Sequence, residues 1–431
     1  MFSAARRCLP FGLVVVVSAW LASSISALGD WRGDSWPAVD ALAHGQLADY
    51  LSAKAMMGPF STLVQAPFVA LGGGDALHAY RWAAFPCLLA AGLLGLYLAS
   101  VARRRGASRL SQVLLAGLCL VNPITIEALN YGHPEEILTS ALAVGAIASA
   151  SEGHRARTAV LLGLAVASKQ WAVIAILPAL MALPDRRVRT GLAAGAIMVA
   201  LTLPGLLAAP GSFSEVNHSA ASTGRITSPW SVWYPSAGVK TEKHRVGTET
   251  LVAHVHEAPP LVGSLSHPLI VLLAFALPVA LALRRGGFAL PGADAMGLLA
   301  LLALLRCGLD PLDNLYYHEP LLLALIGWDA LSPGRLPLRT LAATAIAFFF
   351  RNWSLHLTDV TAFNDIYVFV FAIASAAISL ALFRPKQLMS TAPASYPVGR
   401  PSVGSREPDF LPDEAQISRI KGFEALSKRG G

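Results

Sequence analysis

The sequence predicts an all-α integral membrane protein, folded as a multi-span helical bundle. Of its 431 residues, 55% are hydrophobic and only 14% are charged, whereas about a quarter of the residues of a soluble globular protein are charged. Apolar runs of roughly 20 residues, the length that crosses a bilayer, recur along the chain. We expect about 10–12 transmembrane helices within residues 1–383, followed by a largely disordered cytoplasmic tail over 384–431, which is rich in Pro, Ser and Gly.

The charges between the apolar runs indicate an orientation. Arginine-rich loops such as 103–105 and 186–189 fall on one side if the segment 156–183 crosses the membrane twice, with a break at Lys169-Gln170-Trp171; a single crossing would separate these loops. Because basic loops stay in the cytoplasm, we expect both termini there and the protein in the plasma (inner) membrane. The predicted spans are 9–28, 83–101, 110–128, 136–151, 156–168, 170–183, 190–209, 267–283, 295–309, 316–331, 338–353 and 366–383.

Composition also argues against several classes of protein. The net charge of +7 is typical of cytoplasmic membrane loops and gives no reason to expect a nucleic-acid partner. The acidic pairs lack a clear DxD motif, so we expect no metal and no other cofactor. The first apolar segment resembles a secretory signal, but the many spans that follow favour an uncleaved anchor. The four cysteines show no CxxC spacing, so they indicate neither a zinc site nor a disulfide framework; they are Cys8, Cys87, Cys119 and Cys307.

Two long outer loops, 29–82 and 210–266, are expected to pack on each other as a lid. The first contains Ala and Leu at helical spacing over 37–51 and 59–71, which predicts short helices in the membrane interface. The second contains Asn217, His218, Arg225 and the aromatic group Trp230, Trp233 and Tyr234. These aromatic residues suit either a lid or sugar platform or an interfacial aromatic belt.

Charged residues at the outer ends of the spans are the candidates for chemistry. Asp30 and Asp34 directly follow the first span, and we regard Asp34 as the chemical centre with Asp30 as its rival. Asp34 could instead only cap a helix that begins near Trp36. Four basic residues at the outer ends of the spans oppose the positive-inside trend; they are Arg81, Lys169, Arg306 and Arg351. They either pair with carboxylates, as Arg306 could with Asp310 four residues later, or bind an anionic ligand such as a phosphate.

Four short motifs together resemble the GT-C glycosyltransferases, and most of all the glycosyltransferase 87 family of polyprenol-phosphate-mannose-dependent enzymes. The first is the loop segment 34–50, in which an aspartate precedes a small-residue helix, a glycine and a tyrosine. The others are Gly132-His133-Pro134-Glu135-Glu136, Ala167-Ser168-Lys169-Gln170-Trp171 and Asn314-Leu315-Tyr316-Tyr317-His318.

The resemblance implies that a sugar, mannose in that family, passes with inversion from a polyprenyl-phosphate donor to an extracytoplasmic glycolipid or glycan acceptor. A phosphate leaves without a strong acid, so one carboxylate suffices as the base, Asp34 or Asp30. Lys169, with Arg306 or His318, would hold the phosphate. The remaining candidates for substrate binding are His133, Glu135, Glu136, Gln170, Asn314 and Tyr317.

A transporter or lipid flippase is the alternative to an enzyme. The break within 156–183 fits the broken helices of transporters. The polar groups, however, concentrate at one face of the predicted bundle, whereas transporters bind their substrates near the bilayer midplane. We therefore expect an enzyme whose cavity holds a lipid-linked substrate.

Overall fold

A computed structural model describes residues 2–212, 214–216, 226–246, 249–332 and 336–384, with the backbone alone described at 2–7 and 242–254. Residues Met1–Arg384 form one compact unit. The predicted disorder of the tail concerns residues 385–431, which lie outside the described residues.

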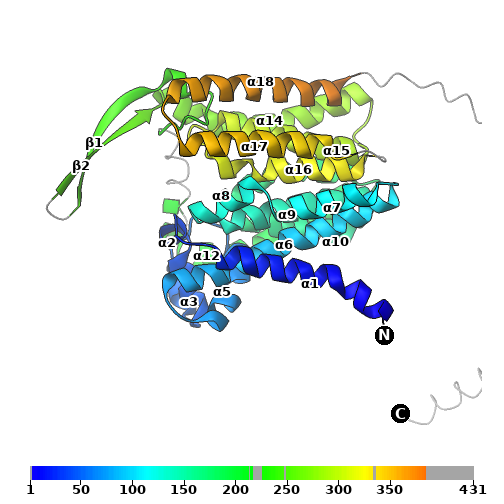
Figure 1. The fold of residues 1–431 in the computed structure, drawn as a ribbon, viewed down its shortest axis with the longest axis horizontal. Coiled ribbons are helices and arrows are strands. Elements are labelled where there is room, and N and C mark those ends of the chain that lie inside the picture. The colour runs from blue at the N-terminus through cyan, green and yellow to red at the C-terminus, as the bar shows by residue number, and fades with distance from the viewer. Residues whose placement is uncertain (1, 213, 217–225, 247–248, 333–335, 385–431) are drawn as a thin grey trace, which may run out of the picture. The chain divides into compact units, whose positions relative to one another are not determined.

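Every predicted span falls on helical chain, and these helices run side by side (Figure 1). Among the described residues, six helices are long and apolar enough to cross a membrane, fewer than the number of predicted spans, because the others are shorter or more polar. The elements are α1 (Phe2–Ser23), α6 (Ala76–Arg104), α7 (Arg109–Leu118), α8 (Pro123–Tyr131), α9 (Pro134–Ser151), α10 (Arg155–Ser168), the 3₁₀ turn η1 (Gln170–Ala175), α11 (Ile176–Ala182), α12 (Arg187–Ala208), α14 (Pro260–Arg285), α15 (Gly292–Leu309), the 3₁₀ turn η4 (Leu315–His318), α16 (Glu319–Leu331), α17 (Leu338–Leu355) and α18 (Val360–Phe383).

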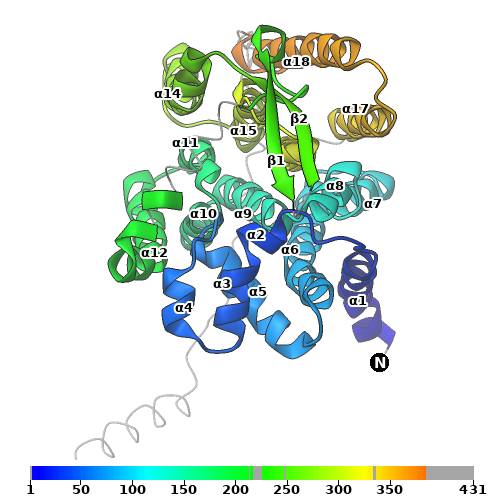
Figure 2. The same cartoon turned by 90° about the vertical axis from the view of Figure 1, so that its left-hand side faces the viewer.

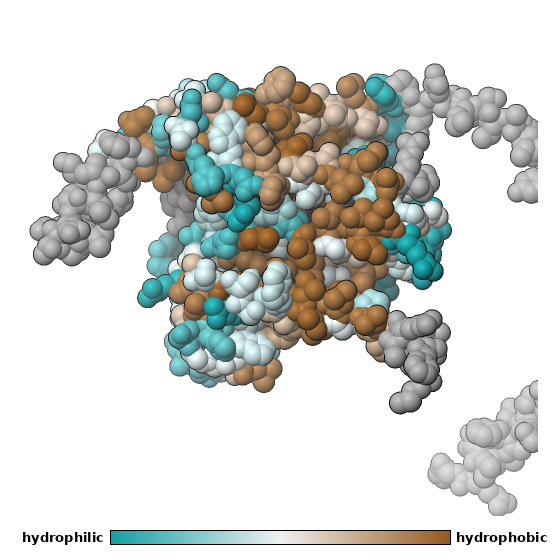
Figure 3. All heavy atoms as spheres, in the orientation of Figure 1, coloured by the Kyte–Doolittle hydropathy of each residue, from teal (hydrophilic) through white to brown (hydrophobic). Residues whose placement is uncertain are grey.

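The core lies along α9, α15 and α16, whose side chains are buried on nearly all sides. Small residues on α9 allow close packing against α6, α10 and α16. By contrast, α1, α12, α14 and α18 expose large apolar side chains, among them Leu9, Val188, Leu283 and Phe369. Hydrophobic residues cover much of the middle of the face in Figure 3, and hydrophilic residues gather towards its two ends. Exposed apolar surface of this extent is typical of contact with lipid.

One end of the bundle carries the basic loops, and we call it the basic end. Arg155 pairs with Asp185, with 2.6 Å between Nε and Oδ1. Residues 155 and 185 therefore lie at the same end, and the intervening chain goes out through α10 and returns through η1 and α11, as two passes. The N–H of Leu290 donates to the carbonyl of Met181 at 2.8 Å, which brings the start of α15 to the same end.

The opposite end, which we call the site end, carries the helices of loop 29–82 (Figure 2). These are α2 (Trp31–Asp34), α3 (Trp36–Ala43), α4 (Leu47–Ser52) and α5 (Pro59–Gly72). The predicted helix over 37–51 is divided in two, because Gly45 adopts φ +72° between α3 and α4. Trp31 anchors the group: it is fully buried, and its Nε1 donates to Gln65 Oε1 at 3.0 Å.

Two glycines bring the first outer loop against the link between α8 and α9. Gly29 (φ +54°) and Gly132 (φ +87°) both adopt left-handed backbone conformations, which favour glycine. A Cβ atom on Gly132 would lie 2.5 Å from the carbonyl oxygen of Leu28, and one on Gly29 would lie 2.3 Å from that of Tyr131. The backbones therefore cross in contact, and the N–H of Asp30 donates to the Tyr131 carbonyl at 2.8 Å.

Substitution of Gly132 by Ala is expected to separate these backbones. A left-handed non-glycine residue costs about 1–3 kcal/mol, and the steric overlap adds to that cost. Thermal unfolding in detergent should show a clear loss of stability. Gly33→Ala, in the loop that Gly132 contacts, is the control, because no heavy atom lies within 4 Å of its added Cβ. Equal melting temperatures for the two variants would contradict this account of the crossing.

The loop 210–266 contains a β-hairpin that the sequence did not predict, and its role as a lid stays a prediction. It contains an antiparallel hairpin of β1 (Gly238–Val246) and β2 (Glu249–Glu257), which projects beyond the helix ends at the site end (Figure 1). Contact with loop 29–82 is made at the start of the segment, where Glu215 pairs with Lys54 and Ser212 bonds to the carbonyl of Ser52. Asn217, His218 and Arg225, which we expected in the lid, lie outside the described residues.

The aromatic group of this loop is an internal anchor and not an open sugar platform. Trp230 is buried and packs against Phe350, Phe363 and Tyr367. Trp233 donates its indole N–H to the carbonyl of Leu309 at 2.8 Å. The segment 226–237 is thereby fastened to the outer ends of α15 and α18.

Candidate functional site

Lys169 lies between two buried glutamates at the site end. Helix α9 begins at Pro134, which suits the first position of a helix, and it carries Glu135 and Glu136 in its first turn, where the helix dipole favours negative charge. Lys169 follows the last residue of α10, where a positive charge is favoured. Its Nζ lies 2.8 Å from Glu135 Oε1 and 2.9 Å from Glu136 Oε1. One cation is thus shared by two fully buried carboxylates.

Arg306 joins this group from the end of α15. Its Nη2 lies 3.7 Å from Glu136 Oε1, and its guanidinium carbon lies 5.1 Å from the ring centre of Trp171 and 4.7 Å from that of Tyr317. Trp171 also donates its indole N–H to Glu136 Oε2 at 2.7 Å. Aromatic faces on a desolvated guanidinium stabilise its charge and fix its plane.

His133 connects the same group to the first outer loop. Its Nδ1 lies 2.9 Å from Glu135 Oε1, and its Nε2 lies 3.3 Å from Asp30 Oδ2. Its ring stacks on Tyr316 at 4.4 Å between centres. Burial alone would lower the pKa of His133, but the charge of Glu135 and the hydrogen bonds to both carboxylates outweigh burial and raise the pKa to about 9. His133 is therefore cationic at neutral pH. We call Asp30, His133, Glu135, Glu136, Lys169 and Arg306 the ion-pair cluster.

Asp30 and Asp34 differ in their surroundings. The hydrogen bond with His133 lowers the pKa of Asp30, and its side chain is 63% exposed. Asp34 lies one helical turn later and is half-buried, and among the described residues its carboxylate makes no hydrogen bond and no ion pair. Burial raises the pKa of Asp34 above its usual value, and the charges that act on it include those of His133 and Lys169. Asp34 thus borders the ion-pair cluster with its proton-accepting oxygens free.

The interpretation of Asp34 as a helix cap is not supported. Ser35, and not Asp34, occupies the residue before α3, and Asp34 is the last residue of α2. The N–H of Met56 donates to the main-chain carbonyl of Asp34 at 3.0 Å, so the backbone here is fixed from a second side. The position of the carboxylate is therefore set by the packing of the loop.

The ion-pair cluster holds three cationic groups and three carboxylates. It has no surplus positive charge, and it leaves donors unused: an ammonium group has three N–H donors, of which one is donated to Glu135 Oε1. The Lys169 side chain is 18% exposed, so a remaining donor can reach a ligand. The arrangement suits an anion of low charge combined with hydroxyl groups.

The other two outer cations do not join the cluster. Arg81 donates twice to the carbonyl of Ile25, at 3.0 and 2.8 Å. Arg351 pairs with Glu127 at 2.9 Å. Arg306 does not pair with Asp310, which was one of the two alternatives, because Asp310 adopts an extended backbone after α15 and lies 3.6 Å from His267. Only Lys169 and Arg306 of the four predicted cations therefore converge.

Gln170, Asn314 and His318 lie beside the cluster and not within it. Gln170 lines an apolar groove of about 520 Å³ between α4, α5, α10 and α12. Gly58 also lines the groove, and its N–H donates at 2.8 Å to the carbonyl of Ser168, the residue before Lys169. His318, which directly follows Tyr317 in the sequence, is buried near Asp313 and Tyr367. Asn314 begins the turn that carries Tyr317.

The model of glycosyltransferase family 87 matches residues 57–310, more than half of the chain. The chain belongs to this family. It is therefore a membrane glycosyltransferase and not a transporter, and the family predicted from the short motifs is confirmed. The helical multi-span fold with short outer-loop helices is likewise as predicted.

Two other comparisons add little. No curated protein matches this glycosyltransferase. The chain is similar to the archaeal oligosaccharyltransferase AglB from Archaeoglobus fulgidus, in complex with an inhibitory peptide and a dolichol-phosphate, at 13% identity and a TM-score of 0.39. The likeness covers 86% of this chain and 55% of that one, so the chain spans about half the length of that protein.

Three residues of the glycosyltransferase site were not singled out from the sequence. Trp171 and Tyr316 contact the ion-pair cluster through their rings, and Gly29 sets the crossing that positions Asp30. Trp171 and Tyr316 belong to two of the four short motifs that resemble family 87, so their place beside candidate residues in the sequence could have identified them. Gly29 directly precedes Asp30, but its role could not be inferred from that position, because it depends on a backbone that approaches from residue 131.

The glycosyltransferase is expected to lose stability as the pH rises from about 6.5 to about 9. The pKa of His133 is higher in the folded than in the unfolded state, so its contribution is complete below the unfolded pKa near 6.5 and is lost through the folded pKa of about 9. The contribution is on the order of 3 kcal/mol. Melting temperatures of the wild type and His133→Gln, measured across this range, should converge at high pH. Parallel curves would contradict the charged state of His133.

Proposed function

We propose that the enzyme transfers a sugar, mannose by family resemblance, from a polyprenyl-phosphate donor to a hydroxyl group of an extracytoplasmic lipid or glycan acceptor. Asp34 is the general base in this proposal. The observation that carries it is the free, half-buried carboxylate of Asp34 at the border of the ion-pair cluster. The acceptor oxygen attacks C1 of the sugar, its proton passes to Asp34, and the bond from C1 to the phosphate oxygen breaks.

The charge balance of the cluster supports a phosphodiester donor. A polyprenyl-phosphate sugar carries one negative charge, and a second develops on the phosphate as the sugar leaves. Lys169 and Arg306 are fixed by Glu136, Trp171 and Tyr317, so they need no rearrangement to meet that second charge. Fixed donors aimed at developing charge lower the barrier of a transfer reaction. In this proposal, the two glutamates and His133 bind sugar hydroxyls.

The apolar groove supports a lipid chain on the donor. It runs between the short helices α4 and α5 and helix α12, whose outer surface is almost entirely exposed apolar residues. Leu201 and Gly205 of α12 form one wall, and Gln170, next to Lys169, lies on another. A prenyl chain in this groove would leave its phosphate beside Lys169.

The test is transfer by the purified enzyme in detergent. Polyprenyl-phosphate mannose and polyprenyl-phosphate glucose are supplied separately, each with extracts of cell-envelope acceptors. We expect transfer of mannose with inversion at C1 and release of polyprenyl phosphate. Transfer from a nucleotide sugar without any lipid donor would overturn the proposal, and transfer of glucose alone would overturn the assignment of mannose.

Leu201→Trp is expected to weaken binding of a long-chain donor, because the larger ring fills the groove. The KM for the long-chain donor should rise roughly tenfold or more, since each buried methylene contributes about 0.8 kcal/mol. The KM for a donor with a short prenyl chain should not change. Leu207→Trp is the control, because Leu207 lies on the same helix, is 72% exposed and does not line the groove. Equal effects on both donors would remove the groove from the proposal.

A further inference from the structure

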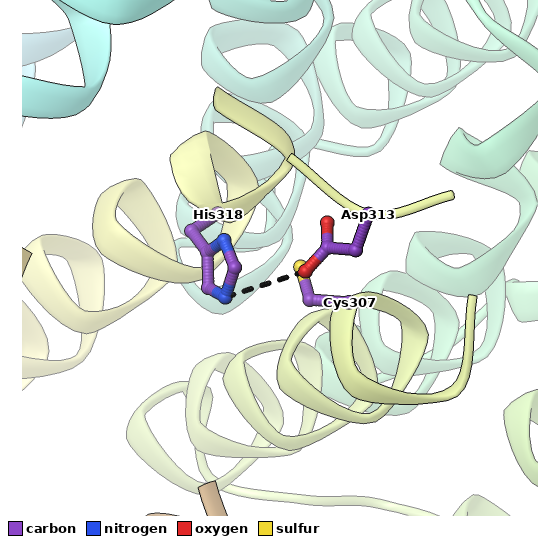
Figure 4. A group of neighbouring side chains, drawn as sticks. All are labelled: Cys307, Asp313 and His318. Atoms are coloured by element: carbon purple, nitrogen blue, oxygen red, sulfur yellow. Dashed lines mark ion pairs between the residues drawn. The ribbon is translucent and has the colours of Figure 1, made fainter. Parts of the chain in front are cut away.

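A second polar cluster lies next to Tyr317, whose carbonyl accepts a hydrogen bond from the thiol of Cys307 at 3.1 Å. Cys307 comes from α15, Asp313 from the loop that follows, and His318 from the end of η4. All three side chains are buried, and one possible ligand atom from each lies within 4.8 Å of the others. Figure 4 shows the three side chains pointing toward one another, and its dashed line joins His318 Nε2 to Asp313 Oδ2, which lie 3.7 Å apart.

The hydrogen bonds around this group leave its lone pairs facing inward. The Nδ1 of His318 lies 3.2 Å from the carbonyl of Leu315, so it carries the proton and leaves Nε2 as an acceptor, which shares the single hydroxyl proton of Tyr367 with Asp313 Oδ2. Asp313 accepts the N–H of Asn314 at its Oδ1, at 2.9 Å, and turns Oδ2 to within 3.7 Å of His318 Nε2. A histidine held by a carbonyl at its other nitrogen is the usual arrangement of a metal ligand.

The charge of Asp313 also points to a missing cation. Its side chain is fully buried, and no lysine or arginine pairs with it in the part of the chain that the structure describes. Burial of an unpaired carboxylate costs several kcal/mol. A divalent cation would supply the counter-charge that the surrounding helices lack.

We propose that Cys307, Asp313 and His318 bind a structural zinc ion, with the Tyr367 hydroxyl as the fourth ligand. A thiolate, a carboxylate and an imidazole are a ligand set that zinc accepts, and its tetrahedral ligands lie about 3.3–3.8 Å apart. The 3.7 Å between Nε2 and Oδ2 already meets this spacing. The Tyr367 hydroxyl now lies at hydrogen-bond distance, 3.1 Å from Nε2 and 3.2 Å from Oδ2, and would move a few tenths of an ångström outward on binding. On binding, the thiol proton of Cys307, now directed at the Tyr317 carbonyl, is released to solvent.

The ion would fasten two residues of the glycosyltransferase site without taking part in transfer. Cys307 directly follows Arg306, and His318 directly follows Tyr317, whose ring lies against the Arg306 guanidinium. A zinc ion that joins the end of α15 to η4 therefore fixes the distance between Arg306 and Tyr317. This role does not depend on the identity of the donor or of the base.

Metal content measured on the full-length protein tests the proposal. The protein is produced with added zinc, purified with a tag that binds no metal, and analysed by mass spectrometry for zinc. We expect one zinc per chain in the wild type and in the control Cys119→Ser, whose cysteine is equally buried elsewhere, and only background in Cys307→Ser and His318→Gln. Wild-type protein without stoichiometric zinc, or zinc retained in both variants, would overturn the proposal.

A second measurement does not need the variants to fold equally well. Wild-type protein loaded with cobalt in place of zinc should show a thiolate-to-cobalt charge-transfer band, and a strong zinc chelator should lower its melting temperature. Chelator should not change the melting temperature of Cys307→Ser. A wild type that shows neither the band nor the shift contradicts the site, whatever its transfer activity.

Discussion

Asp34→Asn is expected to abolish most sugar transfer while the enzyme still folds and binds its donor. Asparagine keeps the shape of the side chain and loses the proton acceptor. General-base catalysis contributes about 10²–10⁴-fold, so kcat should fall by that factor or more. The Asp34 carboxylate has no hydrogen-bond or ion-pair partner among the described residues. Its replacement therefore leaves no other charged group without a partner, and the melting temperature should hardly change.

Asp30→Asn is the matched control, one helical turn away on the same loop. Asp30 already shares its carboxylate with the imidazolium of His133, and its pKa is lowered, so it is a weaker base. We expect a smaller loss of kcat for Asp30→Asn than for Asp34→Asn. If Asp30→Asn is inactive while Asp34→Ser remains active, the base is Asp30 and the assignment is wrong.

Lys169→Ala should reduce both donor binding and turnover, and it should also destabilise the fold. The substitution leaves Glu135 and Glu136 buried without their shared cation, and removal of one member of a buried ion pair costs about 3–5 kcal/mol. KM for the donor should rise because the phosphate loses a charged donor. Melting temperatures and donor titrations, measured on the same preparation, report the two effects.

The double variant Lys169→Met with Glu135→Gln separates these two effects. It removes one cation and one carboxylate together, so most of the lost stability should return. Donor binding should stay weak, since the phosphate partner is still absent. Recovery of donor binding along with stability would show that Lys169 is a structural residue and does not bind the phosphate.

The sequence alone was enough to predict the class of protein and the helical stretches on which its predicted spans fall, but not their ends, since α1 ends at Ser23 and α14 begins at Pro260. Hydrophobic composition and span length depend on solvation by lipid, which acts on each segment independently of its neighbours. The break at Lys169 was also predicted from the sequence. A single crossing by residues 156–183 would place the arginines near residue 187 on the opposite side of the membrane from Arg155 and Arg157. Short motifs were also enough to indicate family 87.

The partners of the charged residues were decided only by the tertiary structure. Lys169 pairs with Glu135, 34 residues away in the sequence, and Arg306 pairs with Glu136 and not with Asp310, because α15 ends before Asp310. Spacing rules describe neighbours on one helix, and they cannot describe contacts between helices. Asp34 and Asp30 look equivalent in the sequence, and they differ in the structure because the crossing at Gly29 and Gly132 brings His133 to Asp30 alone. Trp230, a surface residue by its sequence context, is buried because α17 and α18 pack around it.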